Sequence, residues 1–131
     1  MDIASSLELI VETAKFMQRL DVIDVEFTSG HTLELYVAVE KRDRAQGLSN
    51  MPSLDSDGMI FYYGVPTYAP FSMRNMEMDL DIGWFNSDGK MIAHGSYSKD
   101  HKHPIVSPEP FSYVIETPKG MLPLADLKIN G

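Results

Sequence analysis

The first twenty residues have the pattern of an amphipathic helix. Charged residues occupy one face, and apolar residues recur on the other at steps of three and four: Leu7, Ile10, Val11, Ala14 and Met17. Ser5 and Glu8 have the spacing of a capping box, which predicts a helix from about Ser5 to Leu20. We expect this helix to cover the β domain or its open edge, with docking on a partner or a second copy as the alternative.

From Asp21 onward the pattern changes to short strands separated by turn residues. Alternating or β-branched runs predict strands over 22–27, 32–39, 59–63, 80–85, 90–94, 111–117 and 127–129. Turn residues at 29–31 and 86–89 predict two hairpins, 43–48 predicts one helical turn, and 64–70 and 96–110 read as loops. We therefore predict a mostly β fold, a compact small β-barrel or sandwich over residues 21–131, with the helix of residues 1–20 added.

Composition and charge restrict the partners of this chain. A length of 131 residues suits one domain, and 11 Lys plus Arg against 19 Asp plus Glu give a formal net charge of −8. Such a chain repels phosphate backbones and anionic lipid surfaces, so we expect neither a nucleic acid nor a membrane as partner. The absence of cysteine excludes disulfides and thiol nucleophiles. The amino terminus does not read as an export signal, which predicts a cytoplasmic location.

Several short motifs occur in the order and spacing of a known family. They are Arg44-Ala45-Gln46-Gly47-Leu48, then Asp57-Gly58-Met59-Ile60-Phe61, Phe71-Ser72-Met73-Arg74-Asn75 and Leu80-Asp81-Ile82, and finally Ile115-Glu116 with Gly120. The pattern resembles the domain of unknown function family number 192 over residues 33–130. The resemblance implies a small, mostly β fold and no particular reaction. Some members of that family occur in phage genomes, which extends the expected location to a host cytoplasm or a virion. Ser72 stands where the family usually has tryptophan, a ring that would line a pocket.

The stretch from Asn75 to Ile82 carries the most suggestive chemistry, and we expect residues 71–82 to form one extended segment. An extended conformation would place Glu77, Asp79 and Asp81 on one strand face, which is either a solvated acidic surface or a site for a hard cation. Asp81 has apolar neighbours and needs a partner if it is buried. We expect that partner to be Arg74, with Arg44 as the second candidate.

This acid and its partners allow two interpretations. The pair either braces the structure, or it joins Asn75 in a polar cluster facing a pocket, where an arginine would grip a carboxylate or a phosphate. The predicted ligand-binding residues are Arg74, Asn75, Asp81, Phe71, Tyr68 and Arg44.

Three histidines form a second candidate site. His101 and His103 lie two residues apart in a predicted loop, and His94 lies on the preceding strand, so that together they could hold a zinc ion. The alternative is an ordinary solvated loop.

Standard catalytic and cofactor motifs are missing, which favours binding over catalysis and predicts no cofactor. We expect a non-catalytic binding or interaction domain whose partner is a small ligand or a protein. One alternative is a structural or accessory protein that self-associates as a homo-oligomer or docks on a larger assembly, such as a phage particle. A second alternative is a metal-assisted hydrolase that uses the histidines.

Overall fold

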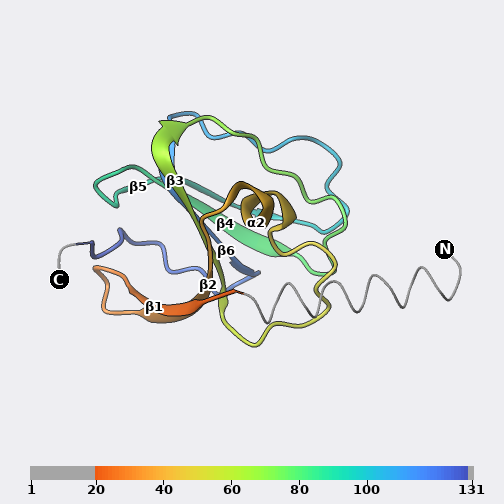
Figure 1. Cartoon of the computed structure of the whole chain (residues 1–131), viewed down its shortest axis with the longest axis horizontal. Coiled ribbons are helices and arrows are strands. Elements are labelled where there is room, and N and C mark those ends of the chain that lie inside the picture. Colours follow the sequence, from red (N-terminus) through yellow and green to blue (C-terminus); the bar gives the residue numbers. More distant parts are fainter. Residues whose placement is uncertain (1–19, 130–131) are drawn as a thin grey trace, which may run out of the picture.

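The computed structural model describes residues 20–129, which form six strands and one helix. The elements are β1 (Val22–Glu26), β2 (Thr32–Ala38), α2 (Lys41–Gln46), β3 (Gly58–Thr67), β4 (Leu80–Phe85), β5 (Met91–Tyr97) and β6 (Phe111–Pro118). All six strands belong to one sheet with the order β1-β2-β3-β6-β4-β5 (Figure 1). The predicted mostly β fold is confirmed, and the helix predicted for residues 1–20 lies outside the described residues except for Leu20. The sheet is open, with β1 and β5 as its edges, so it does not close into a barrel.

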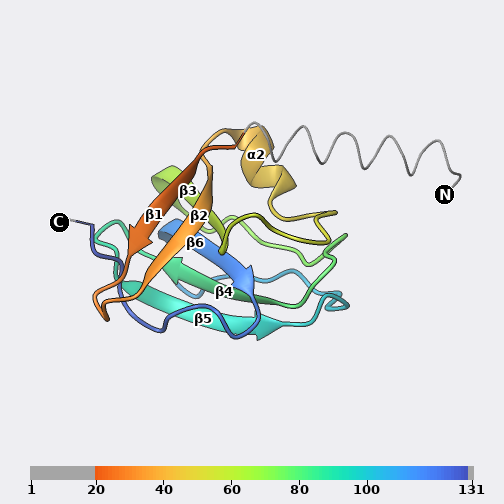
Figure 2. The same ribbon diagram turned by 90° about the horizontal axis from the view of Figure 1, so that it is seen from below.

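Strand β6, the last in the chain, lies in the middle of the sheet between β3 and β4 (Figure 2). It runs antiparallel to both neighbours, and every other pair is antiparallel except β2 and β3. A parallel pair needs a long crossover, and the connection through α2 supplies it. Residues of β6 are buried on both faces, which is typical of a central strand.

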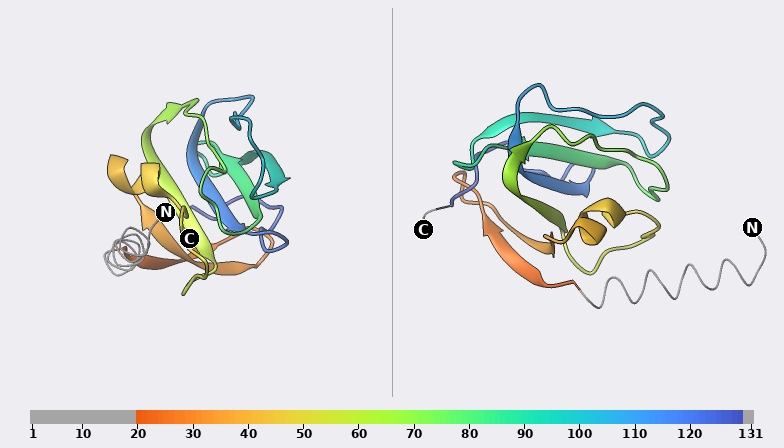
Figure 3. Two further views of the ribbon diagram at one scale, coloured as in Figure 1. Left: turned by 90° about the vertical axis from the view of Figure 1, so that its right-hand side faces the viewer. Right: turned by 45° about the horizontal axis from the view of Figure 1, so that its top comes forward.

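Each face of the sheet carries its own hydrophobic cluster. One face holds Met59, Phe61, Val114 and Trp84, packed against residues of the segments that follow β2 and β3, such as Phe71. The other face is covered by the segment after β6 and holds Leu35, Ile60, Phe85, Ile115, Leu122 and Leu127. Side chains alternate along a strand, so Glu116 projects to the same face as Val114. Figure 3 shows α2 lying against the curved sheet.

The local predictions agree with the structure at both hairpins and at the helical turn. Helix α2 ends at Gly47, whose φ of 53° is a left-handed value that glycine adopts easily. Strand β3 is longer than predicted and runs on to Thr67 through Pro66. Its pairing with β6 shifts register between Tyr62 and Thr67, and such an irregularity tolerates a proline. The predicted final strand over 127–129 is reduced to a single bridge between Leu127 and Phe27.

Gly58 allows β3 to begin in close contact with β6. Its φ is 152°, and a Cβ atom at this position would lie 2.0 Å from the carbonyl oxygen of Glu116. No other residue type fits so near a neighbouring backbone. Gly58 therefore fixes how closely β3 approaches the part of β6 that carries Glu116.

Residues 71–79 form a loop, which corrects the prediction of one extended segment from 71 to 82. Phe71 and Met73 are buried and anchor this loop in the core. The N–H of Met76 donates to the carbonyl of Met73 and closes a turn in which Asn75 has a φ of 62°. Asparagine tolerates this left-handed conformation better than most residues. Strand β4 begins only at Leu80, so the three predicted carboxylates do not line one strand face.

The described residues include no helix with the length and apolar character needed to cross a membrane.

Candidate functional site

A cavity of about 310 Å³ opens on the face of the sheet that carries α2. Its walls come from α2 and the residues after it, from β3, from the loop over 70–76 and from β6. We call it the Glu116 pocket, and its lining consists of Arg44, Ala45, Gln46, Gly47, Ser49, Phe61, Tyr63, Pro70, Phe71, Ser72, Arg74, Asn75, Met76 and Glu116. A pocket with aromatic walls and a few polar groups has the usual composition of a small-molecule site.

Glu116 is the buried acid of this pocket. Only 1% of the residue is exposed, and its Oε1 atom has no hydrogen-bond partner. Burial raises the pKa of Glu116 from its usual 4.5 to about 8. The side chain is therefore mostly protonated at neutral pH and can both donate and accept a hydrogen bond. A Cβ atom at Gly47 would lie 3.8 Å from Oε1, so Gly47 lies directly beside the carboxyl group.

Arg44 and Tyr63 form a polar wall of the pocket. The guanidinium carbon of Arg44 lies 4.4 Å from the ring centroid of Tyr63, and Arg44 Nη1 donates to the carbonyl of Tyr62 at 3.3 Å. Burial raises the pKa of the Tyr63 hydroxyl, the positive charge of Arg44 opposes this rise, and the charge of Glu116 adds to it. The opposing influences indicate that all three side chains share one electrostatic environment.

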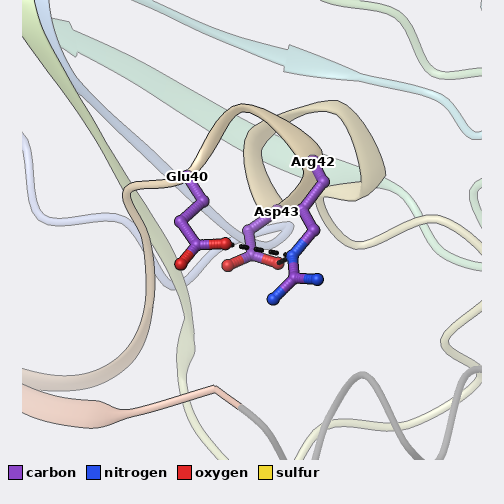
Figure 4. A network of polar contacts seen from close by, with 3 residues as sticks. All are labelled: Glu40, Arg42 and Asp43. Atoms are coloured by element: carbon purple, nitrogen blue, oxygen red, sulfur yellow. Dashed lines mark ion pairs between the residues drawn. The ribbon is translucent and has the colours of Figure 1, made fainter.

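The position of Arg44 depends on the short helix α2. Two residues earlier on this helix, Arg42 forms ion pairs through Nε with Glu40 at 3.0 Å and with Asp43 at 3.9 Å (Figure 4). Arg42 does not line the pocket. The two arginines of α2 therefore differ in their contacts. Arg42 pairs with acids outside the pocket, whereas Arg44 contacts Tyr63 inside it.

The structure brings four of the six predicted ligand-binding residues together. Arg44, Phe71, Arg74 and Asn75 all line the Glu116 pocket. Tyr68 does not line it and is 60% exposed.

The predicted pair between Asp81 and Arg74 is not formed, which corrects the sequence-based expectation. The Asp81 carboxylate accepts hydrogen bonds from the Ser96 hydroxyl and from the N–H groups of Gly120 at 2.8 Å and Leu122 at 3.4 Å. Asp81 therefore braces the segment after β6. Arg74 lies in the exposed turn of the 71–79 loop, where its guanidinium group has no ion pair with any described residue.

The three candidate metal ligands are not gathered into one cluster. The rings of His101 and His103 lie 5.9 Å apart, and His101 packs on Tyr97 at 5.3 Å between centroids. His94 is exposed on β5. Among residues 20–129 no group of three or more His, Cys, Asp or Glu side chains is arranged to hold a metal ion.

Sequence reasoning did not select Glu116, Tyr63 or Phe61 as site residues. The alternation along β6 gave no signal for Glu116, because its face of the strand also carries Ser112 and is the more polar of the two in the sequence. Its burial follows from the central position of β6 in the sheet, which the sequence pattern does not show. Tyr63 and Phe61 gave no local signal, since aromatic residues on a strand are ordinary core residues.

The motifs that border the pocket are those of one family. The sequence model of DUF192, described as an uncharacterized ACR, matches residues 24–130. The chain belongs to the DUF192 family. Of the DUF192 motif residues quoted above, Arg44, Gly47, Phe71, Arg74 and Glu116 all line the same cavity, although they lie far apart in the sequence.

Two crystal structures share the DUF192 fold seen here. One is described as a candidate transcription regulator from Sinorhizobium meliloti 1021. Its sequence is 29% identical to this chain, the TM-score is 0.64, and the match covers 76% of this chain and 80% of the chain in that structure. The other is a protein of unknown function from Novosphingobium aromaticivorans DSM 12444. Its sequence is 27% identical to this chain, the TM-score is 0.63, and the match covers 77% of this chain and 74% of the chain in that structure. No curated protein matches this chain significantly.

Proposed function

We propose that this DUF192 domain is a non-catalytic binding domain that holds a small organic molecule in the Glu116 pocket. The observation that supports the proposal most directly is the unpartnered Oε1 atom of a carboxyl group that is almost completely buried and lines the cavity. A buried polar atom without a partner costs free energy, typically about 1–3 kcal/mol. A ligand that hydrogen-bonds to Glu116 would recover that cost.

The surrounding side chains indicate which molecules would fit. Phe61 and Phe71 meet edge to face at 5.4 Å between centroids, and Tyr63 completes an aromatic wall. Such walls favour a flat apolar group, and the protonated carboxyl group favours a neutral hydrogen-bonding substituent on it. We therefore expect a ligand with a ring or another planar body that carries a hydroxyl, amide or amine function.

A panel of monocyclic aromatic alcohols, amides and amines, each matched with its parent hydrocarbon, tests the proposal. In ¹⁵N-labelled protein we expect the polar members to shift the amide resonances of Gly47, Tyr63 and Glu116. They should bind roughly 2- to 13-fold more tightly than the hydrocarbons, the range given by one hydrogen bond of about 0.5–1.5 kcal/mol.

Glu116→Met removes the hydrogen-bonding atoms while nearly keeping the volume, so it should abolish the preference for polar members of the panel. Arg42→Met is the matched control, because Arg42 lies on α2 outside the pocket. If no member of the panel perturbs the pocket resonances, or if Glu116→Met keeps the full preference, the proposed function is wrong.

A further inference from the structure

A second cavity of about 390 Å³ adjoins the Glu116 pocket. The two cavities share Ser72, Arg74 and Asn75 on their lining, so they lie next to each other along the 71–79 loop. We call the second cavity the basic hollow, and its lining consists of Ser72, Met73, Arg74, Asn75, Lys99, Asp100, His101 and Lys102. Its lysines come from a part of the chain that contributes nothing to the lining of the Glu116 pocket.

Backbone contacts hold the two loops that form this hollow side by side. Phe71 and Ile105 exchange both backbone hydrogen bonds, each at 2.8 Å. The N–H of Lys99 donates to Asp79 Oδ1 at 2.8 Å, and the N–H of His101 donates to the carbonyl of Ser98 at 2.9 Å. The lysine-bearing loop is therefore fixed along the 71–79 loop, and the hollow is a built feature of the fold.

The basic hollow concentrates positive charge on an acidic protein. Arg74, Lys99 and Lys102 line it, and none of the three has an ion pair with any residue between 20 and 129. Asp100 is the one acid among the lining residues, and His101 adds an imidazole. Three cations that have no ion pair within residues 20–129 outnumber the single acid of the lining, so the local charge is opposite in sign to the net charge of −8 of the chain.

We propose that the ligand of this domain is a small phosphate ester, with its phosphate in the basic hollow on Arg74, Lys99 and Lys102 and its organic part in the Glu116 pocket. The inference rests on the function proposed above and names the class of ligand. A phosphate dianion suits three cations better than a carboxylate does, and a guanidinium group binds it through two parallel hydrogen bonds. The net negative charge of the molecule selects small esters, since a polymeric phosphate backbone would be repelled.

Titrations with inorganic phosphate, phenyl phosphate and benzoate at constant ionic strength test this inference. Inorganic phosphate should shift the amide resonances of residues 72–75 and 99–102. Phenyl phosphate should shift the same resonances together with those of Gly47 and Glu116, and should bind more tightly than either inorganic phosphate or benzoate. The double variant K99M/K102M should weaken phenyl phosphate about fivefold, as expected for two exposed charge contacts.

The double variant K41M/K90M is the matched control, because it removes the same charge from exposed lysines outside both cavities. Its affinity for phenyl phosphate should stay within about twofold of the unmodified protein. The inference is overturned if phosphate shifts none of these resonances, if benzoate binds as tightly as phenyl phosphate, or if both double variants lose the same affinity.

Failure of this inference is distinguishable from failure of the proposed function. In the first case the uncharged aromatic panel still binds at Glu116 while inorganic phosphate has no effect. In the second case the panel leaves the Glu116 pocket unperturbed, whatever phosphate does at the basic hollow.

Discussion

Glu116 is a carboxyl group that the fold holds away from both water and a counter-ion. The physical cause is its place on the central strand, where Met59 on β3 and Ile82 on β4 are its direct cross-strand neighbours. Both neighbours are apolar and fully buried, so neither can solvate a charge. The result is an acid that is mostly protonated at neutral pH and loses its proton as the pH rises through about 8.

This protonation makes the stability of the protein depend on pH in a direction unusual for an acid. The pKa of Glu116 is about 8 in the folded protein against its usual 4.5, so between these values the native state binds a proton that the unfolded state has lost. The stabilising contribution is complete below pH 4.5 and is lost as the pH rises through about 8. The unfolding free energy should therefore fall by up to about 1.4 kcal/mol per pH unit in this window.

Denaturant unfolding of the natural protein and of Glu116→Gln between pH 5 and pH 9 measures the effect. Glutamine has nearly the same shape and does not titrate, and every other group titrates alike in both proteins. The difference in unfolding free energy between the two proteins should thus shift steadily in favour of the glutamine variant as the pH rises. A difference that stays constant over this range would show that Glu116 is already ionised in the folded protein.

The sheet is joined to the segment after β6 by the side chain of Asp81. This carboxylate on β4 accepts from Ser96 on β5 and from two N–H groups beyond β6, so it links three stretches of chain. The segment it holds continues into Leu122 and Leu127, which cover one face of the sheet. An acid expected at a ligand site is therefore a structural brace in this fold.

Replacing Asp81 should destabilise the protein, whereas replacing Arg74 should not. Asp81→Ala leaves the N–H of Gly120 without its acceptor, and a cost of about 1–3 kcal/mol is expected. Arg74→Ala removes an exposed side chain without an ion pair among the described residues, so a change within about 0.5 kcal/mol is expected. Urea unfolding of both variants measures these changes.

Asp88→Ala is the charge-matched control for Asp81→Ala, since Asp88 is exposed in the β4–β5 turn. Equal losses for Asp81→Ala and Arg74→Ala would instead support the pair expected from the sequence.

The sequence predicts local secondary structure more completely than it predicts the contacts between distant segments. Hairpins and strands follow from alternation and turn residues, and both act over a few neighbours. The alternation of Met76, Met78 and Leu80 with acids favours an extended conformation over 71–82, but residues 71–79 form a loop. Its turn at Arg74 and Asn75 is imposed by tertiary contacts of Phe71 and Met73, which no local pattern records.

The candidate site illustrates the same limit. Arg44, Phe71, Arg74 and Asn75 were selected from the sequence, and they meet in one pocket. The acid predicted to join them is Asp81, which lies nearer to them along the chain than Glu116 does. The acid that actually lines the pocket comes from β6 and is brought there by strand order, which alternation alone does not reveal.

At the scale of the whole molecule, most contacts within the sheet join distant parts of the chain. Strand β6 pairs with β3, about fifty residues earlier, and β2 pairs with β3 only after a crossover. Folds dominated by such non-local pairs fold slowly, in milliseconds to seconds, because the chain loses loop entropy before the contacts form.

Stopped-flow refolding monitored through Trp84 should show this slow phase. Trp84 is the one tryptophan of the chain and is 2% exposed on β4, where it contacts Phe71, so its emission reports closure of the core. We expect the main change in fluorescence on a timescale of milliseconds or longer. Complete recovery within microseconds would contradict the dominance of non-local pairing.

The central place of β6 also matters while the protein is being made on the ribosome. Until residues 111–118 have emerged, β3 and β4 each present an unpaired edge, and the two halves of the sheet have nothing to join them. Translation is slow compared with strand pairing, so a nascent chain spends seconds with both edges open to chaperones or to neighbouring chains. Pairing of this late segment with β3 and β4 completes the sheet and brings Glu116 to its pocket.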